Sequence, residues 1–445
     1  MKKFLSILLA ILMLAVMLPV TAMAEENYVM ISGITGVENE KYASFEAAYN
    51  AIKPKLEALC KSDALGQGGT TAEEFDALFP TRDENGNATL TYTICGNITY
   101  DESNLANLLT FGRRASHYGN DRHLINFKFV GATGRDSDTL TVKSNITLPY
   151  EWWGEKTTTS ISFENLTITG PAPNGLYPTQ KFFEGINFKV DNCKLEGIKI
   201  YNCSNVGGSY TITNNIFDGT NAPQNAYAIH LQGNETAPLT INISNNTISG
   251  YDRGINIDQK TAAATISNNN ISVKDTGRSC IQLTRLASTK VENNTMNLTG
   301  GNAITLHEEL LNCAKPEITV SGNTINGTGY LIYDDATANN KSFTNDNLTL
   351  TITEDNTVAK TVDITQGVKG STKYGMSEIV KTTVENNVVP GGSTGGTIVI
   401  ITPTEDTPKT EPEKNPTTGA NDVVAAAVAL MSVSALGAAV LTRKK

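Results

Sequence analysis

Tryptophan, histidine and basic residues are scarce in this sequence. It has two Trp and four His, and 35 Lys plus Arg stand against 45 Asp plus Glu, for a formal net charge of −10. An acidic surface repels nucleic acid phosphates, so we expect no nucleic acid as a partner. The same balance suits solubility outside a cell and binding of cations or neutral glycans.

The common catalytic motifs are also missing. The sequence contains no HExxH zinc motif, no glycine-rich phosphate loop, no Cys/His zinc spacing and no nucleophile elbow. We therefore expect neither a metal site nor a cofactor.

The cysteines follow no recognisable pattern. None of the six lies in a CxxC motif, although an even count permits disulfides in an exported protein. Cys60 could pair with Cys95. We favour buried or free thiols, because free Cys commonly behaves as a small apolar side chain. The six are Cys60, Cys95, Cys193, Cys203, Cys280 and Cys313.

Residues 1–24 have the three parts of a secretory signal peptide. Lys2 and Lys3 are followed by an apolar run over residues 4–20 and by a small-residue cleavage site that ends at Ala24. The alternative is an uncleaved membrane helix. The acidic residues that follow Ala24 favour cleavage.

The C-terminal residues 415–445 also have three parts. A pentapeptide precedes an apolar stretch at 423–441, just long enough to cross a bilayer, and a basic tail follows. This order resembles the Gram-positive cell-wall sorting signal, whose usual pentapeptide is Leu-Pro-x-Thr-Gly. The resemblance implies that sortase cleaves after Thr418 and joins it to peptidoglycan, so the chain contacts the membrane only through 423–441 before sorting. A plain membrane anchor is the alternative. The recognition residues are Asn415, Pro416, Thr417, Thr418 and Gly419, with Asn415 in place of Leu.

Residues 401–414, just before this segment, are rich in Pro and Thr. Such a composition cannot build a core, so we expect an extended tether.

A self-similar unit recurs through the middle of the chain. Each copy has an alternating apolar strand, an Asn turn and a second short strand, and the first seven copies begin 22 to 31 residues apart. Short strands at this period indicate one coil of a solenoid per repeat. Asn suits the turn because it tolerates the left-handed region, and stacked Asn amides can hydrogen-bond from coil to coil. The copies begin at Phe163, Val190, Ile212, Ile243, Ile266, Val291 and Val320, and one at Val384 closes the series.

The pattern resembles the right-handed parallel β-helix repeat of the pectin-lyase-like superfamily, over about residues 120–390. The resemblance implies an all-β fold, a right-handed parallel β-helix solenoid over residues 121–400. We expect residues 25–120 to form a small α/β N-terminal cap with the first coils. The expected cap elements are helices at 44–60, 71–79 and 101–111 and a strand at 88–100, with Ser44 capping the first helix.

One outward face could carry function. In the strand that follows most copies, the residue between two apolar residues should point outward. We expect one column of His230, Asn256, Gln282 and Thr305, and a second column of Gln232, Asp258, Thr284, His307 and Asp334, with Arg285, Glu308 and Asp335 beside it.

Carboxylates, imidazoles and a guanidinium on this rigid face could perform acid/base chemistry or bind sugar. The catalytic candidates are His230, Asp258, His307 and Asp334, and the ligand-binding candidates are Arg285 and Glu308. An ordinary solvated face is the alternative.

A second candidate for ligand binding is the pair Trp152 and Trp153, whose rings could stack on sugars. The alternative is a loop folded back as a hydrophobic clamp.

Enzymes that share the fold supply a further comparison. Of the four motifs of polygalacturonase-like hydrolases, only Asp334-Asp335 occurs. A pectate-lyase-like site needs clustered Asp for calcium, and in the expected register Asp258 and Asp334 lie three coils apart, too far to share an ion. Calcium binding is therefore unsupported.

These observations favour a wall-anchored adhesin or glycan-binding β-helix, with sortase, peptidoglycan and a host or environmental glycan as partners. The alternatives are a polysaccharide lyase or glycoside hydrolase displayed on the wall, and a structural element of the surface layer.

Overall fold

The computed structural model describes residues 27–59, 72–84, 86–101, 125–147, 158–171, 175–177, 186–203, 208–233, 238–274, 278–337, 341–364 and 377–388. The chain divides into two units, residues 1–400 and 401–445, and everything described lies in the first.

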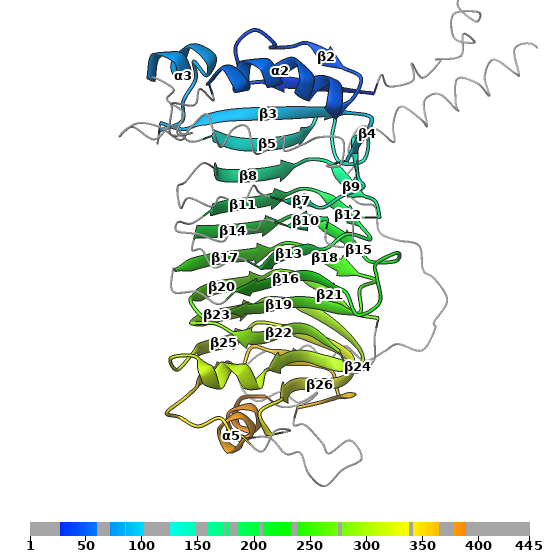
Figure 1. Cartoon of the computed structure of the whole chain (residues 1–445). Coiled ribbons are helices and arrows are strands. Elements are labelled where there is room, and N and C mark those ends of the chain that lie inside the picture. The colour runs from blue at the N-terminus through cyan, green and yellow to red at the C-terminus, as the bar shows by residue number, and fades with distance from the viewer. Residues whose placement is uncertain are drawn as a thin grey trace, which may run out of the picture. The chain divides into compact units, whose positions relative to one another are not determined.

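Within these ranges the strands form two long, almost entirely parallel sheets (Figure 1). The first runs in the order β2 (Lys41–Tyr42), β1 (Tyr28–Ser32), β3 (Ala88–Cys95), β5 (Ile125–Gly131), β8 (Thr158–Glu164), β11 (Ile186–Asp191), β14 (Gly208–Thr213), β17 (Leu239–Ser244), β20 (Ala262–Ser267), β23 (Ser288–Glu292), β25 (Glu317–Ser321) and β27 (Thr349–Ile352). Only β1 is antiparallel to its neighbours.

The second sheet contains two ladders, which join where β24 and β26 run through both. The ladder of short strands contains β4 (Asn97–Tyr100), β6 (Thr139–Val142), β9 (Thr167–Thr169), β12 (Lys194–Glu196), β15 (Ile216–Asp218), β18 (Thr247–Ser249), β21 (Asn270–Ser272), β24 (Thr295–Leu306), β26 (Thr324–Asp334) and β28 (Thr357–Val358). The other contains β7 (Ile146–Thr147), β10 (Leu176–Tyr177), β13 (Ile200–Cys203), β16 (Tyr227–Gly233), β19 (Arg253–Gln259), β22 (Ser279–Arg285), then β24, β26 and β29 (Val362–Asp363). Each coil thus has three sides, and the coils stack as a parallel β-helix at about 4.8 Å per step.

Where a repeat has two consecutive Asn residues at its turn, the two have different roles. The first adopts a positive φ at the bend, for example 59° at Asn245 and 56° at Asn268. The second points inward and is buried, as in Asn246 and Asn269, each 1% exposed. The predicted coil-to-coil stacking of Asn amides is confirmed for this second position, in the inner ladder Asn215, Asn246, Asn269, Asn294, Asn323 and Asn356.

The core inside the first coils is aromatic. In successive coils Tyr92 stacks on Phe129 with ring centroids 5.2 Å apart, and Phe129 stacks on Phe163 at 4.9 Å. The aromatic column continues through Phe188 to Tyr210, with these rings meeting edge to face. After Tyr210 the same inward column contains aliphatic residues and Thr289 instead of aromatic rings, beginning with Ile241 and Ala264.

Helices cover both ends of the described stack (Figure 1). At the N-terminal end lie α2 (Phe45–Leu59) and α3 (Ala72–Leu78), both as predicted, and Ser44 accepts the Ala47 amide as a cap. Phe45 of α2 packs on the Tyr92 ring at 5.6 Å and covers the aromatic core. The strand expected at 88–100 is two strands, β3 and β4, because the chain bends at Gly96 with a φ of 67°. The helix expected at 101–111 falls almost wholly outside the described residues.

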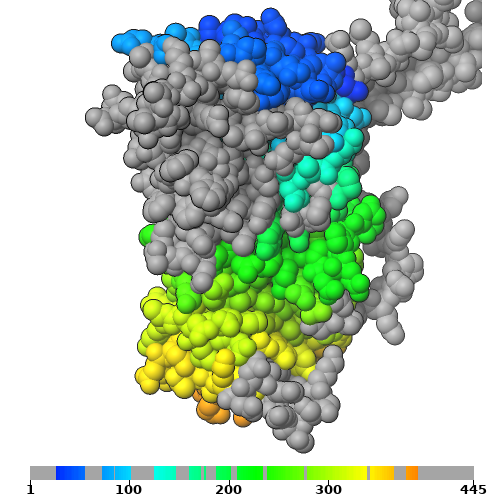
Figure 2. Space-filling model, viewed as in Figure 1, coloured from blue at the N-terminus to red at the C-terminus, as the bar shows by residue number. Residues whose placement is uncertain are grey.

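At the opposite end the prediction of a last repeat from Val384 is wrong. This segment belongs to helix α5 (Glu378–Asn387). Val380, Val384 and Val388 recur every four residues and are buried, so the segment has helical rather than strand periodicity. Within the described residues the last coil comes earlier, at β27, β28 and β29, and the turn between its first two strands contains Asn356. Figure 2 shows the coloured surface following chain order along the stack, from the α2 end in blue to the α5 end in orange.

Candidate functional site

The candidate face is the outer side of β13, β16, β19, β22, β24 and β26. The predicted first column is confirmed, since His230, Asn256, Gln282 and Thr305 are register partners in successive coils. The column extends beyond the prediction at both ends, to Tyr201 before His230 and to Tyr333 after Thr305.

The predicted second column is only partly correct. Gln232 and Asp258 are aligned, but a bulge after Ile257 places Asp258 opposite Arg285 rather than Thr284. A bulge adds one residue to one strand and cannot be read from the apolar pattern alone.

Asp334 does not lie on the outward face at all. It aligns with the inward Leu306, is 0% exposed, and accepts the backbone amides of Ala336 at 3.1 Å and Ser377 at 2.7 Å. The prediction failed because both Leu331 and Ile332 are buried, which makes the inward parity of β26 ambiguous in sequence. Burial raises the pKa of the Asp334 carboxyl.

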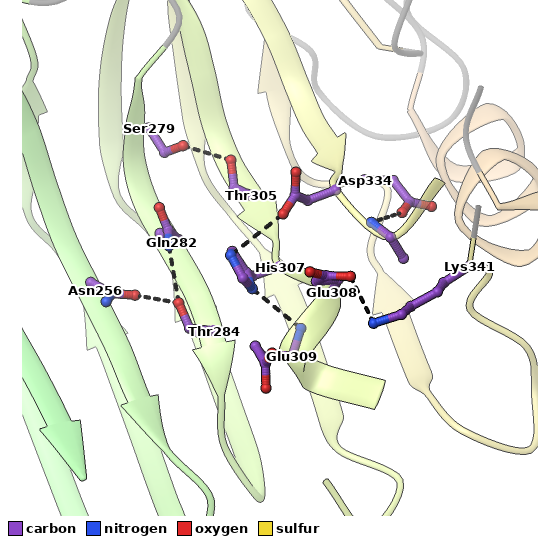
Figure 3. A network of polar contacts seen from close by, with 12 residues as sticks. Asn256, Ser279, Gln282, Thr284, Thr305, His307, Glu308, Glu309, Asp334 and Lys341 are labelled. Atoms are coloured by element: carbon purple, nitrogen blue, oxygen red, sulfur yellow. Dashed lines mark hydrogen bonds and ion pairs between the residues drawn. The ribbon is translucent and has the colours of Figure 1, made fainter. Parts of the chain in front are cut away.

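The outward neighbour of His307 is instead Asp335, whose Oδ2 lies 3.5 Å from His307 Nε2. The other ring nitrogen, Nδ1, accepts the Glu309 amide at 3.2 Å, so His307 caps the short 3-10 helix η1 (Glu308–Asn312). Figure 3 shows the ring held between these contacts. One nitrogen of His307 thus holds the start of η1, and the other faces the Asp335 carboxylate.

The remaining charged candidates are also paired. Asp258 and Arg285 form an ion pair with side chains 11% and 15% exposed. Glu308 lies 2.8 Å from the Lys341 ammonium (Figure 3). Such pairs connect one coil to the next and leave little charge available to a ligand.

Uncharged side chains of the first column form hydrogen bonds with one another and with their neighbours Thr284 and Ser279. Gln282 donates to the Thr284 hydroxyl at 3.0 Å, and that hydroxyl donates to Asn256 at 2.8 Å (Figure 3). The hydroxyls of Ser279 and Thr305 lie 2.5 Å apart. This part of the face is a closed hydrogen-bonded surface.

The part of the face nearer the N-terminal end, around β13 and β16, differs, and of its residues the sequence predicted only His230. The His230 ring lies against the Tyr201 ring, edge-on at 5.0 Å, and against the Tyr227 ring at 4.8 Å. We name Tyr201, Tyr227 and His230 the aromatic ledge. Extending the first column one coil back would have found Tyr201. No sequence signal places Tyr227, which precedes the alternating part of its strand.

Hydrogen bonds hold the aromatic ledge in place. Tyr201 donates to Gln232 at 3.0 Å, and Tyr227 donates to Gln282 at 2.9 Å, two coils away. Burial lowers the pKa of His230 to about 4, and the nearby cations Lys199 and Arg253 act in the same direction against an opposing effect of Asp258. His230 is therefore a neutral ring at neutral pH.

Several candidates fall outside the described residues. They are Trp152 and Trp153, the signal peptide, the tether and the sorting residues 415–419. No helix among the residues that the structure describes is both long and apolar enough to cross a bilayer. Within the same residues, no three His, Cys, Asp or Glu side chains gather as a metal site would require.

Four cysteines have a described side chain, and all four are free: Cys95, Cys193, Cys280 and Cys313. The favoured interpretation of free thiols is confirmed for these four. Burial raises the pKa of Cys193 and Cys280 to about 12, so these thiols are unreactive at neutral pH.

Comparison with known proteins supports the same fold. A family model described as a right handed beta helix region matches residues 175–348. Together with the parallel sheets, this match establishes the predicted all-β fold, a right-handed parallel β-helix. No curated protein and no solved structure matches the chain.

Proposed function

We propose that this protein is a non-catalytic, glycan-binding β-helix displayed on the wall of a Gram-positive bacterium. The observation that carries the binding role is the aromatic ledge on a rigid sheet. Aromatic faces stack on sugar rings, and a β-helix holds its outer side chains at fixed spacing, so a polymer of sugars can lie along the coils.

The non-catalytic part rests on the state of the four candidate residues. His307 caps η1 through Nδ1, Asp258 is paired with Arg285, Asp334 is buried, and His230 lies against two tyrosine rings. General acid/base catalysis needs a titratable group within reach of substrate and free to exchange a proton.

The location rests on the two chain ends. The signal peptide at 1–24, the tether at 401–414 and the sorting residues at 415–419 form a consistent series for export and attachment to peptidoglycan by sortase. In this arrangement the tether holds the β-helix away from its attachment point.

The binding role is tested with the full chain, purified in mild detergent, on an array of polysaccharides, with product release assayed on the same polymers. Binding without new reducing ends or unsaturated products supports the proposal. Release of oligosaccharides would overturn it in favour of a lyase or hydrolase. An array with no bound glycan would favour the structural alternative.

Wall attachment needs a separate test, because binding and location could fail independently. In a sortase-positive host, muramidase should release the protein from the wall fraction. A deletion of residues 415–419 should move it to the membrane or the medium. If the deletion left the wall fraction unchanged, attachment by sortase would be excluded.

A further inference from the structure

Two cations flank the aromatic ledge. The Lys199 ammonium lies 5.2 Å from the centroid of the Tyr201 ring. The Arg253 guanidinium lies 4.9 Å from the centroid of the Tyr227 ring and donates to the Tyr227 hydroxyl at 2.9 Å. Both side chains are partly exposed. The three rings and the two cations thus form one continuous patch over β13, β16 and β19.

Neither cation is paired with a described carboxylate. Several other cations of the described coils lie beside acids: Lys128 and Lys189 beside Glu164, Lys194 beside Glu196, Arg285 beside Asp258 and Lys341 beside Glu308. Exposed lysines without such a pair also occur in these coils, Lys290 among them. Lys199 and Arg253 are distinguished by lying over two rings of the same aromatic ledge.

The environment of the pair also favours an anion. The Nε atom of Arg253 is buried and has no hydrogen-bond acceptor among the described groups. Burial lowers the pKa of Lys199, which means that its positive charge is incompletely solvated. A buried donor without an acceptor and a poorly solvated ammonium both gain from an incoming anion.

We propose that this patch, Lys199, Tyr201, Tyr227, His230 and Arg253, binds acidic sugars. A sugar ring stacks on the half-buried rings of Tyr201 and His230, because Tyr227 is buried beneath Arg253, and the carboxylate or sulfate of the sugar contacts Lys199 and Arg253. The inference rests on the proposed glycan-binding function and names the class of glycan. A nucleic acid is a poorer occupant because the remainder of the chain is acidic and repels a long polyphosphate.

The test compares a polymer with its neutral derivative. The full chain, purified in mild detergent, is titrated calorimetrically with hyaluronan, carboxyl-reduced hyaluronan and chondroitin sulfate. We expect hyaluronan or chondroitin sulfate to bind and the carboxyl-reduced polymer to bind at least tenfold more weakly. Preference between the first two assigns the anionic group as carboxylate or sulfate.

Variants locate the site. Lys199→Gln and Arg253→Gln should each weaken binding about tenfold, because each removes a charge-assisted contact. Lys290→Gln is the matched control, since Lys290 is an exposed lysine on β23 of the other sheet. It should bind like the unmodified chain. Thermal unfolding of each variant verifies the fold, and Arg253→Lys should retain most of the affinity if Arg253→Gln proves unstable.

The outcomes separate this inference from the function on which it rests. Equal binding of hyaluronan and its carboxyl-reduced form, or unchanged binding by Lys199→Gln, would overturn the acidic-sugar site while leaving glycan binding intact. If no glycan bound on the array, neutral or acidic, both would be overturned.

Discussion

Asn269 donates from its side-chain amide to the side-chain oxygen of Asn294 at 2.9 Å, across one step of the stack. Its second amide hydrogen bonds the Ile243 carbonyl, and its own oxygen accepts from both the backbone and the side chain of Asn246. Every polar atom of a fully buried side chain is therefore satisfied, and three coils are joined at one residue.

We predict that Asn269→Gly destabilises the protein by about 2–5 kcal/mol, because it leaves buried donors and acceptors of neighbouring coils without partners. Asn268→Gly is the matched control. Asn268 is exposed and has a φ of 56°, which glycine adopts freely, so the same substitution should cost well under about 1 kcal/mol. Urea unfolding of both variants checks the difference. Equal losses would mean that the inner ladder contributes no more than the bend.

A second prediction concerns the end of the stack. Asp334 accepts the Ser377 amide, Ser377 in turn accepts the Phe343 amide through its hydroxyl, and α5 begins at the next residue. Asp334→Ala should therefore loosen α5 and lower stability by about 1–3 kcal/mol. Hydrogen exchange should show the loss of protection first in α5, whereas uniform loss along the coils would contradict a local role.

Asp334→Asn separates charge from hydrogen bonding at the same position. Because the pKa of Asp334 is raised in the folded state, its contribution to stability is present at low pH and declines as pH rises from about 3.8, its ordinary value, through the folded pKa. The amide of the Asp334→Asn variant does not titrate, so that variant has no such dependence. The unmodified protein should therefore lose stability relative to the Asp334→Asn variant as pH rises.

The repeat period and the Asn turns were sufficient to predict a solenoid with one coil per repeat, and the resemblance to the pectin-lyase-like repeat implied the parallel β-helix. They also predicted the first outward column correctly. The dual role of the Asn pair followed from its chemistry, although the sequence did not say which Asn of the pair bends the chain and which stacks inside.

The candidate site was less predictable. Bulges after Ile257 and after Thr299 each shift the register by one residue, and a shift of one residue exchanges the inward and outward sides of a strand. Tyr227 joins His230 only through the three-dimensional stacking of coils. The Val384 segment has the same composition as the repeat. Only the four-residue spacing of its valines indicates a helix rather than a strand.

The pH dependence of stability should report His230. Its pKa is about 4 in the folded protein against an ordinary value of 6.5, so the unfolded chain binds the proton more tightly. The contribution of His230 to the free energy of unfolding is fully present above pH 6.5. It falls as pH decreases from 6.5 to 4, by at most about 1.4 kcal/mol per pH unit. His230→Phe keeps an aromatic ring and should lack this slope. Parallel curves for the two proteins would mean that His230 titrates normally.

The last prediction contrasts two cations of one face. Arg285→Gln leaves Asp258 as an unpaired, mostly buried charge and should cost about 3–5 kcal/mol of stability. Combining it with Asp258→Asn should recover part of that loss, because the uncompensated charge is gone.

Sugar binding by the folded Arg285→Gln protein should be unchanged. Lys199→Gln, which breaks no described ion pair, should show the reverse, with stability retained and binding lost. Urea unfolding and calorimetric titration on the same samples measure both effects. If Arg285→Gln weakened binding as much as Lys199→Gln, the ligand would extend down the face to the Asp258 coil rather than end at the aromatic ledge.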